Sequence, residues 1–196
     1  WHTQGSGKSY SMVFFCQKIH RKLKGNYTFV IMTDRVELDT QIYNTFEGTG
    51  AVKNDKSICA VSGNDLERLL KEDHRYIFSL IHKFNKDVSE PYSSRDDIIV
   101  VSDEAHRTQY GKLAWNMRNA LPNASFIGFT GTPLFKEDEL TKEVFGEYVS
   151  TYDFATAVKD GATVPLYYEN RGEKLKIVHA DINQKIVDKL EDFDLD

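Results

Sequence analysis

The chain has 196 residues, with 25 Lys and Arg against 30 Asp and Glu, a length that suits one α/β domain with its own core. The formal net charge of -5 excludes binding of nucleic acid through an overall positive field, so any such contact must come from local patches. The composition, 40% hydrophobic and 28% charged, is that of a soluble globular protein, and no apolar run is long enough to cross a membrane.

Helical and strand-like patterns alternate along the chain. Residues 8–24 are predicted to form a helix that Gly25 ends, and residues 36–46 a second helix. Further helices are expected near residues 65–71 and 111–121. Short apolar runs typical of buried strands occupy residues 29–32, 58–61, 76–78, 98–101 and 126–129. Because these runs do not alternate with polar residues, both of their faces must be covered, which predicts a parallel sheet with helices on each side and an α/β fold class.

Other parts of the chain carry weaker signals. The sequence opens without a leader-like pattern, and residues 173–196 are acidic and helix-like, so we expect the chain to be a piece of a longer polypeptide at both ends. The polar stretch 85–97 is the only linker-like region. Cys16 and Cys59 lie among apolar neighbours, which favours two reduced core thiols over a disulfide.

The first chemical motif is a glycine-rich turn at residues 5–9, with the sequence GSGKS. Glycines let the backbone turn its N–H groups toward a phosphate, a lysine reaches the β- and γ-phosphates, and a hydroxyl binds Mg²⁺ at the start of a helix. The match is to the short form of this motif, because His2 stands where the long form has glycine. The alternative is an ordinary turn that begins a helix.

The second motif is a pair of adjacent carboxylates, Asp103 and Glu104, directly after a predicted strand. One can hold hydrated Mg²⁺ while the other orients the water that attacks a nucleoside triphosphate; alternatively, both simply begin a helix. Residues 33–35 and 130–132 also follow predicted strands. Since ligands collect beyond the carboxyl ends of parallel strands, these clusters and the glycine-rich turn are expected to converge on one edge of the sheet.

The motifs and their flanking residues resemble motifs I, Ia, II and III of a superfamily-two helicase motor, at residues 1–9, 33–41, 103–111 and 128–133. More closely, they resemble the restriction (HsdR) subunit of type I restriction-modification enzymes. The flanking WHTQ of residues 1–4 and HRTQYG of residues 106–111 carry this closer resemblance, which extends over about residues 1–172.

The resemblance assigns a role to each matching position. It implies a binding site for ATP formed by Gln4, Gly5, Ser6, Gly7, Lys8 and Ser9. Mg²⁺ would be held by Ser9 and Asp103, and the catalytic residues would be Lys8, Asp103 and Glu104, with Glu104 as the base.

Four further positions carry expectations with open alternatives. His106, Thr130 and Thr132 would couple the nucleotide state to DNA or to a partner lobe. For His106 the alternative is a plain residue at a helix start, and for the two threonines a tight turn after a strand. Arg35 faces either a DNA phosphate or a surface carboxylate.

The resemblance also implies an architecture. Residues 1–150 would form the first RecA-like motor lobe without its N-terminal strand, residues 151–172 would close that lobe, and residues 173–196 would begin the connection to a second lobe. An arginine supplied by the second lobe would be missing, so the isolated piece should hydrolyse ATP poorly.

The expected function is ATP- and Mg²⁺-dependent translocation of double-stranded DNA in the cytoplasm, without a membrane, to deliver DNA to a nuclease domain outside this chain. Methyltransferase and specificity subunits would be the partners. Two alternatives remain: another superfamily-two helicase or remodeller, and an ATP-gated clamp that binds DNA without turnover. The presence of both carboxylates disfavours the clamp, which needs no base to activate water.

Overall fold

The computed structural model describes residues 1–103, 110–131 and 145–167. The chain divides into two units, Trp1–Val164 and Pro165–Asp196, and the described helices and strands all lie in the first. The division predicted above, into residues 1–150, 151–172 and 173–196, stays a prediction.

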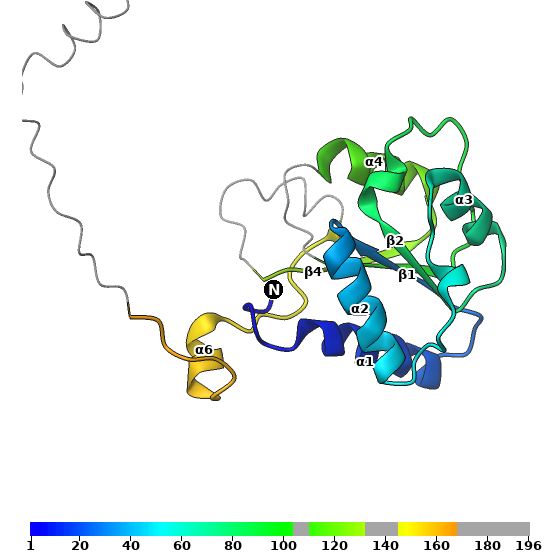
Figure 1. Ribbon diagram of the computed structural model, residues 1–196. Coiled ribbons are helices and arrows are strands. Elements are labelled where there is room, and N and C mark those ends of the chain that lie inside the picture. Colours follow the sequence, from blue (N-terminus) through cyan, green and yellow to red (C-terminus); the bar gives the residue numbers. More distant parts are fainter. Residues whose placement is uncertain (104–109, 132–144, 168–196) are drawn as a thin grey trace, which may run out of the picture. The chain divides into compact units, whose positions relative to one another are not determined.

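A four-stranded parallel sheet forms the centre of the first unit (Figure 1). Its strands are β1 (Thr28–Thr33), β2 (Tyr76–Leu80), β3 (Ile98–Asp103) and β4 (Ser125–Phe129), arranged in the order β2-β1-β3-β4. Every residue of β1 and β3 is buried, whereas β4 lies at an edge and is only partly covered. The non-alternating apolar runs at residues 29–32 and 98–101 therefore form central, fully buried strands as predicted, whereas the run at 126–129 forms the partly exposed strand β4.

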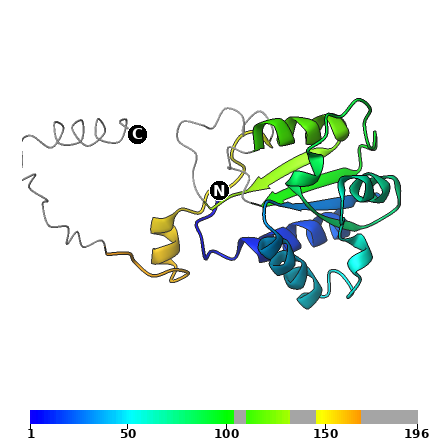
Figure 2. The same cartoon turned by 45° about the horizontal axis from the view of Figure 1, so that its top comes forward.

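Helices cover both faces of this sheet (Figures 1 and 2). Among the described residues, the four longest helices are α1 (Lys8–Lys22), α2 (Val36–Gly48), α3 (Gly63–Lys71) and α4 (Tyr110–Ala120). Successive residues of a strand point to opposite faces, so β1 contributes Phe29 and Ile31 to the core beneath α1 and α2, and Val30 and Met32 to the core beneath α3 and α4. This three-layer arrangement confirms the predicted α/β class.

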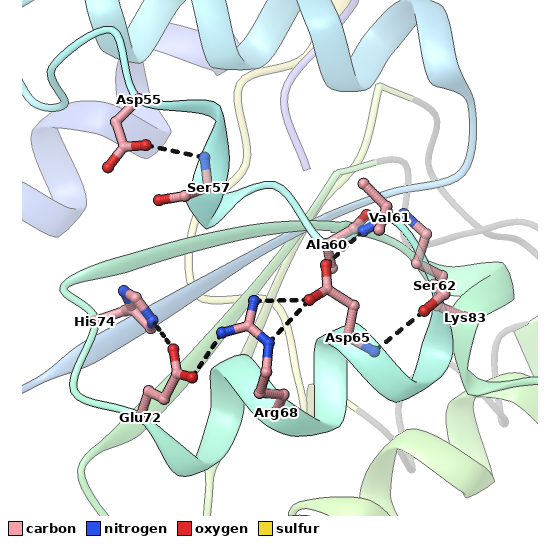
Figure 3. Close-up of polar contacts among 10 residues, drawn as sticks. All are labelled: Asp55, Ser57, Ala60, Val61, Ser62, Asp65, Arg68, Glu72, His74 and Lys83. Carbon is pink, nitrogen blue, oxygen red and sulfur yellow. Dashed lines mark hydrogen bonds and ion pairs between the residues drawn. The ribbon is translucent and has the colours of Figure 1, made fainter.

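Polar side chains close the start of α3 (Figure 3). The Ser62 hydroxyl accepts a hydrogen bond from the Asp65 N–H at 3.1 Å, and the Asp65 carboxylate accepts one from the Val61 N–H at 2.9 Å. Arg68 joins this carboxylate to Glu72, with nitrogen–oxygen distances of 2.7 and 2.6 Å. Side chains of this segment thus accept from one N–H group of the first turn of α3 and from the N–H just before its cap.

The apolar run at residues 58–61 is not a strand, contrary to the prediction. A short 3-10 helix, η1 (Lys56–Ile58), ends at the first residue of the run, and Cys59 forms only an isolated bridge with Phe78 of β2. The ammonium group of Lys83, in the second 3-10 helix η2 (Ile81–Phe84), donates to the Ala60 carbonyl (Figure 3). The run lies between the end of η1 at Ile58 and the cap of α3 at Ser62, so beside β2 it forms only the Cys59 bridge and the 2.9 Å bond from the Ala60 N–H to the Phe78 carbonyl.

The polar stretch 85–97 is a loop within the first unit that hydrogen bonds hold in place, rather than a linker. The N–H groups of Tyr92 and Ser93 donate to the Ala120 carbonyl at 2.9 and 3.2 Å. Arg95 bonds Asp97 at 2.7 Å. Arg95 also donates to the Thr28 hydroxyl at 3.0 Å, so these bonds fasten the loop to the end of α4 and to the start of β1.

The two cysteines are free thiols, as predicted. Burial raises the pKa of Cys16 to about 12 and that of Cys59 to about 11, so both remain protonated and unreactive at neutral pH. Among the described residues, no helix is long and apolar enough to span a membrane.

Candidate functional site

The predicted site clusters that the structure describes lie at one edge of the sheet. Because all four strands are parallel, Thr33 at the end of β1, Asp103 at the end of β3 and Thr130 just after β4 share this edge. The segment leading to the glycine-rich turn joins them, since the His2 N–H donates to the Thr130 carbonyl at 3.0 Å. Figure 1 shows the N-terminus beside the end of β4.

The glycine-rich turn has the backbone shape that its residues predict. Gly5 and Gly7 have φ angles of +81° and +80°, a left-handed conformation that residues with a Cβ rarely adopt. Between them, the hydroxyl and N–H of Ser6 both donate to the Thr3 carbonyl, at 2.6 and 3.3 Å. His2 pairs in an extended bridge with Tyr152, so position 2 needs no glycine.

Helix α1 begins at Lys8 without a side-chain cap. Gly7 stands at the cap position and its first turn contains no acidic residue. The N–H groups at this end therefore lack the side-chain acceptors that serve the start of α3, and the helix dipole places partial positive charge at the same point. Such an end suits an anion.

Asp103 lies on the α1 side of the sheet. It is only 7% exposed and, by alternation along β3, shares a face with Ile99 and Val101, which pack in the same core as Met12 and Val13 of α1. A buried carboxylate on this side is chemically suited to hold a hydrated divalent cation next to a phosphate. Ser9, its predicted partner in holding Mg²⁺, follows Lys8 in the first turn of α1.

The segment after β1 contains both charged and buried polar groups. Arg35 is 58% exposed, and its Nε lies 3.8 Å from the Asp34 carboxylate, a long ion pair that leaves the guanidinium open to other contacts. Asp39, on α2, is partly buried. Burial raises its pKa, whereas Lys83 and a hydrogen bond from Thr33 act in the opposite direction.

Three predicted site residues, Glu104, His106 and Thr132, lie outside the described residues. Thr130 is 5% exposed, and Gly131 follows it. Within residues 1–103, 110–131 and 145–167, no three or more His, Cys, Asp and Glu side chains are grouped so that they could hold a metal ion.

Sequence reasoning missed the segment around Tyr152, which lies beside residues 1–3, the segment that leads into the glycine-rich turn. The Tyr152 N–H donates to the Trp1 carbonyl and the Thr3 N–H to the Tyr152 carbonyl, both at 2.9 Å. No motif marks this position, and the contact joins residues about 150 positions apart in the sequence.

Comparison with known proteins identifies the family to which this chain belongs. The family model of the SWI2/SNF2 ATPases matches residues 1–196, so the chain belongs to this family of ATPases. A solved structure, the helicase domain of Hef from Pyrococcus furiosus, superposes with a TM-score of 0.55 at 18% identity, covering 76% of this chain and 33% of that one. This likeness shows the fold alone, and it is consistent with the RecA-like arrangement predicted from the motifs.

Closer relatives are endonuclease subunits. The HindI type I restriction enzyme endonuclease subunit of Haemophilus influenzae is 45% identical over 190 residues, covering 87% of this chain. The putative MjaIXP endonuclease subunit of Methanocaldococcus jannaschii is 41% identical over 189 residues, covering 93%. The chain spans 18% of the length of each relative. Homology to type I restriction subunits is thus shown, as the flanking motifs predicted.

Proposed function

We propose that this chain is the first motor lobe of a type I restriction endonuclease subunit, which hydrolyses ATP with Mg²⁺ to translocate double-stranded DNA. The observation that carries the proposal is the uncapped, left-handed glycine turn at the same sheet edge as buried Asp103. Membership of an ATPase family and similarity to restriction subunits support it.

In this proposal the residues of the turn bind and orient the triphosphate. The backbone N–H groups of residues 4–9 and the Lys8 ammonium group neutralise the phosphate charge, and Ser9 and Asp103 hold Mg²⁺. The metal, when bound, supplies charge stabilisation at the transferring phosphoryl group. Glu104 accepts the proton of the attacking water.

The remaining residues connect hydrolysis to movement. His106, Thr130 and Thr132 respond to the nucleotide state, and Arg35 contacts a DNA phosphate. A second lobe supplies the missing arginine, and for this reason the chain alone hydrolyses ATP weakly. The whole protein acts in the cytoplasm with methyltransferase and specificity subunits and delivers DNA to a separate nuclease domain.

Two variants of the full-length subunit test this proposal. Lys8→Ala and Glu104→Gln are each expected to reduce DNA-stimulated ATP hydrolysis by about 10³-fold or more, because charge neutralisation and water activation are both needed in the transition state. Glu104→Gln should still bind ATP, measured by titration calorimetry.

A matched control is Lys18→Ala on the exposed part of α1, which should hydrolyse ATP at the wild-type rate. Unchanged hydrolysis in either test variant would contradict the proposal. Translocation without strand separation, measured on labelled duplexes, would favour a restriction subunit over another helicase.

A further inference from the structure

The segment that leads into the glycine-rich turn is held by backbone hydrogen bonds on both sides. On one side the His2 N–H donates to the Thr130 carbonyl at 3.0 Å. On the other, Tyr152 exchanges two bonds of 2.9 Å with the chain, accepting from Thr3 and donating to Trp1. Residues 1–3 are therefore held between the end of β4 and the segment that precedes α6 (Phe154–Lys159).

The same bonds continue into the turn itself. Thr3 is 8% exposed, and while its N–H is bound to Tyr152 its carbonyl receives both donors of Ser6. A continuous series of hydrogen bonds thus runs from Tyr152 through Thr3 to Ser6, between the two left-handed glycines. A shift of Tyr152 would be transmitted directly to the turn.

Side-chain contacts fix Tyr152 in turn. Its ring lies edge-on to the His2 ring, with 5.9 Å between centroids. Its hydroxyl donates to the Asp160 carboxylate at 3.0 Å, and Asp153 caps the intervening helix by accepting from the Thr156 N–H at 2.7 Å. Burial and then the Asp160 carboxylate raise the pKa of Tyr152, so the hydroxyl stays protonated and continues to donate at neutral pH.

We propose that Tyr152 is a positioning residue for the nucleotide turn, and that its bond to Asp160 makes α6 part of the support of that turn. The inference rests on the proposed function. The N–H groups of the turn must face the phosphates, and a support that holds Thr3 and Ser6 in place lowers the ordering cost of binding. Tyr152 consequently acts on nucleotide affinity and leaves the chemical step unchanged.

Tyr152→Phe and Asp160→Ala in the full-length subunit remove the same hydrogen bond from its two ends. Each is expected to raise the KM for ATP about twofold to tenfold, the range of one hydrogen bond, with kcat within about twofold of wild type. The dissociation constant of ADP, measured by calorimetry, should rise by the same factor. The double variant should be no worse than the stronger single variant, since both lose one bond.

Tyr167→Phe is the matched control, because this tyrosine is 92% exposed, and its KM should equal that of wild type. Unchanged KM in both single variants, additive effects in the double variant, or a fall in kcat at constant KM would each overturn the positioning role. Lys8→Ala, measured in parallel, separates the two proposals. If it retains hydrolysis, the proposed function fails; if it loses hydrolysis while Tyr152→Phe behaves as wild type, only the role of Tyr152 fails.

Discussion

The starts of α1 and α3 are built in opposite ways. At α3 the side chains of Ser62 and Asp65 accept hydrogen bonds from backbone N–H groups, and Arg68 holds the carboxylate in place (Figure 3). At α1 a glycine stands at the cap position, with no side-chain bond and no acidic residue in the first turn. Every helix start presents the same kind of backbone donors and the same direction of dipole, so the two ends differ in what meets those donors. A helix start that satisfies itself contributes stability, whereas one left open is suited to bind an anion.

The largest expected effects come from placing the same methyl group at each of these two ends. In Gly63→Ala the added Cβ would lie 2.9 Å from the Lys83 carbonyl oxygen, which belongs to the backbone and cannot easily move. Such overpacking should lower the free energy of unfolding by about 1–3 kcal/mol, measured by urea denaturation. The KM for ATP should not change, because α3 takes no part in the proposed site.

Gly7→Ala meets no atom within 4 Å, but its φ of +80° disfavours any residue with a Cβ. The left-handed conformation costs alanine about 1–2 kcal/mol, and relief of this strain would turn the N–H groups of the loop away from the phosphates. The KM for ATP should therefore rise about tenfold or more. A rise in KM for Gly63→Ala, or no change of any kind for Gly7→Ala, would remove the distinction between the two helix starts.

Local residue patterns predict the elements that depend on neighbouring residues and miss those that depend on contacts between residues distant in the sequence. The helices at 8–24 and 36–46 and the central strands depend on local patterns and formed nearly where expected. Residues 58–61 have an equally apolar pattern, yet they lie between η1 and the cap of α3, and their Ala60 carbonyl accepts from Lys83, over twenty positions away. Local reasoning cannot detect such a contact.

Some features of the candidate site could likewise be predicted from the sequence, and others could not. Its position at the carboxyl edge of the sheet followed from parallel strands alone, and the left-handed glycines followed from the motif. The support given by Tyr152 did not, because a backbone bridge across the sequence leaves no trace in residue types. The chemical roles of Lys8, Asp103 and Glu104 stay predictions.

A smaller effect is expected when the start of α3 is made to resemble that of α1. Ser62→Ala removes the oxygen that accepts from the Asp65 N–H, and loss of such a cap costs about 1 kcal/mol. The midpoint of thermal unfolding should fall by a few degrees while ATP affinity is retained. Ser62→Thr, which keeps a hydroxyl, is the control and should recover most of the loss. Equal midpoints for Ser62→Ala and wild type would mean that capping does not stabilise α3.

The smallest expected effect concerns pH. The Val61 N–H, followed by Arg68, lowers the pKa of Asp65 below its ordinary value of 3.8. A carboxyl whose pKa is lower in the folded state adds stability above its ordinary pKa, and this stability is lost as the pH falls through the folded value. Asp65→Asn should therefore be less stable than wild type at about pH 6, and the difference should shrink below about pH 4, as measured by urea denaturation at several pH values.

Salt should reduce this difference at about pH 6, because Asp65 and Arg68 are near the surface. The start of α1 has no carboxylate in its first turn and should contribute no such dependence, so Ser11→Ala there should differ from wild type by the same amount at every pH. A constant difference between Asp65→Asn and wild type would show that the charge of Asp65 is irrelevant to α3. The two helix starts would then differ in hydrogen bonding alone. The negative charge of Asp65 at the start of α3 would not add to the contrast with the start of α1, which we propose binds the phosphates of ATP.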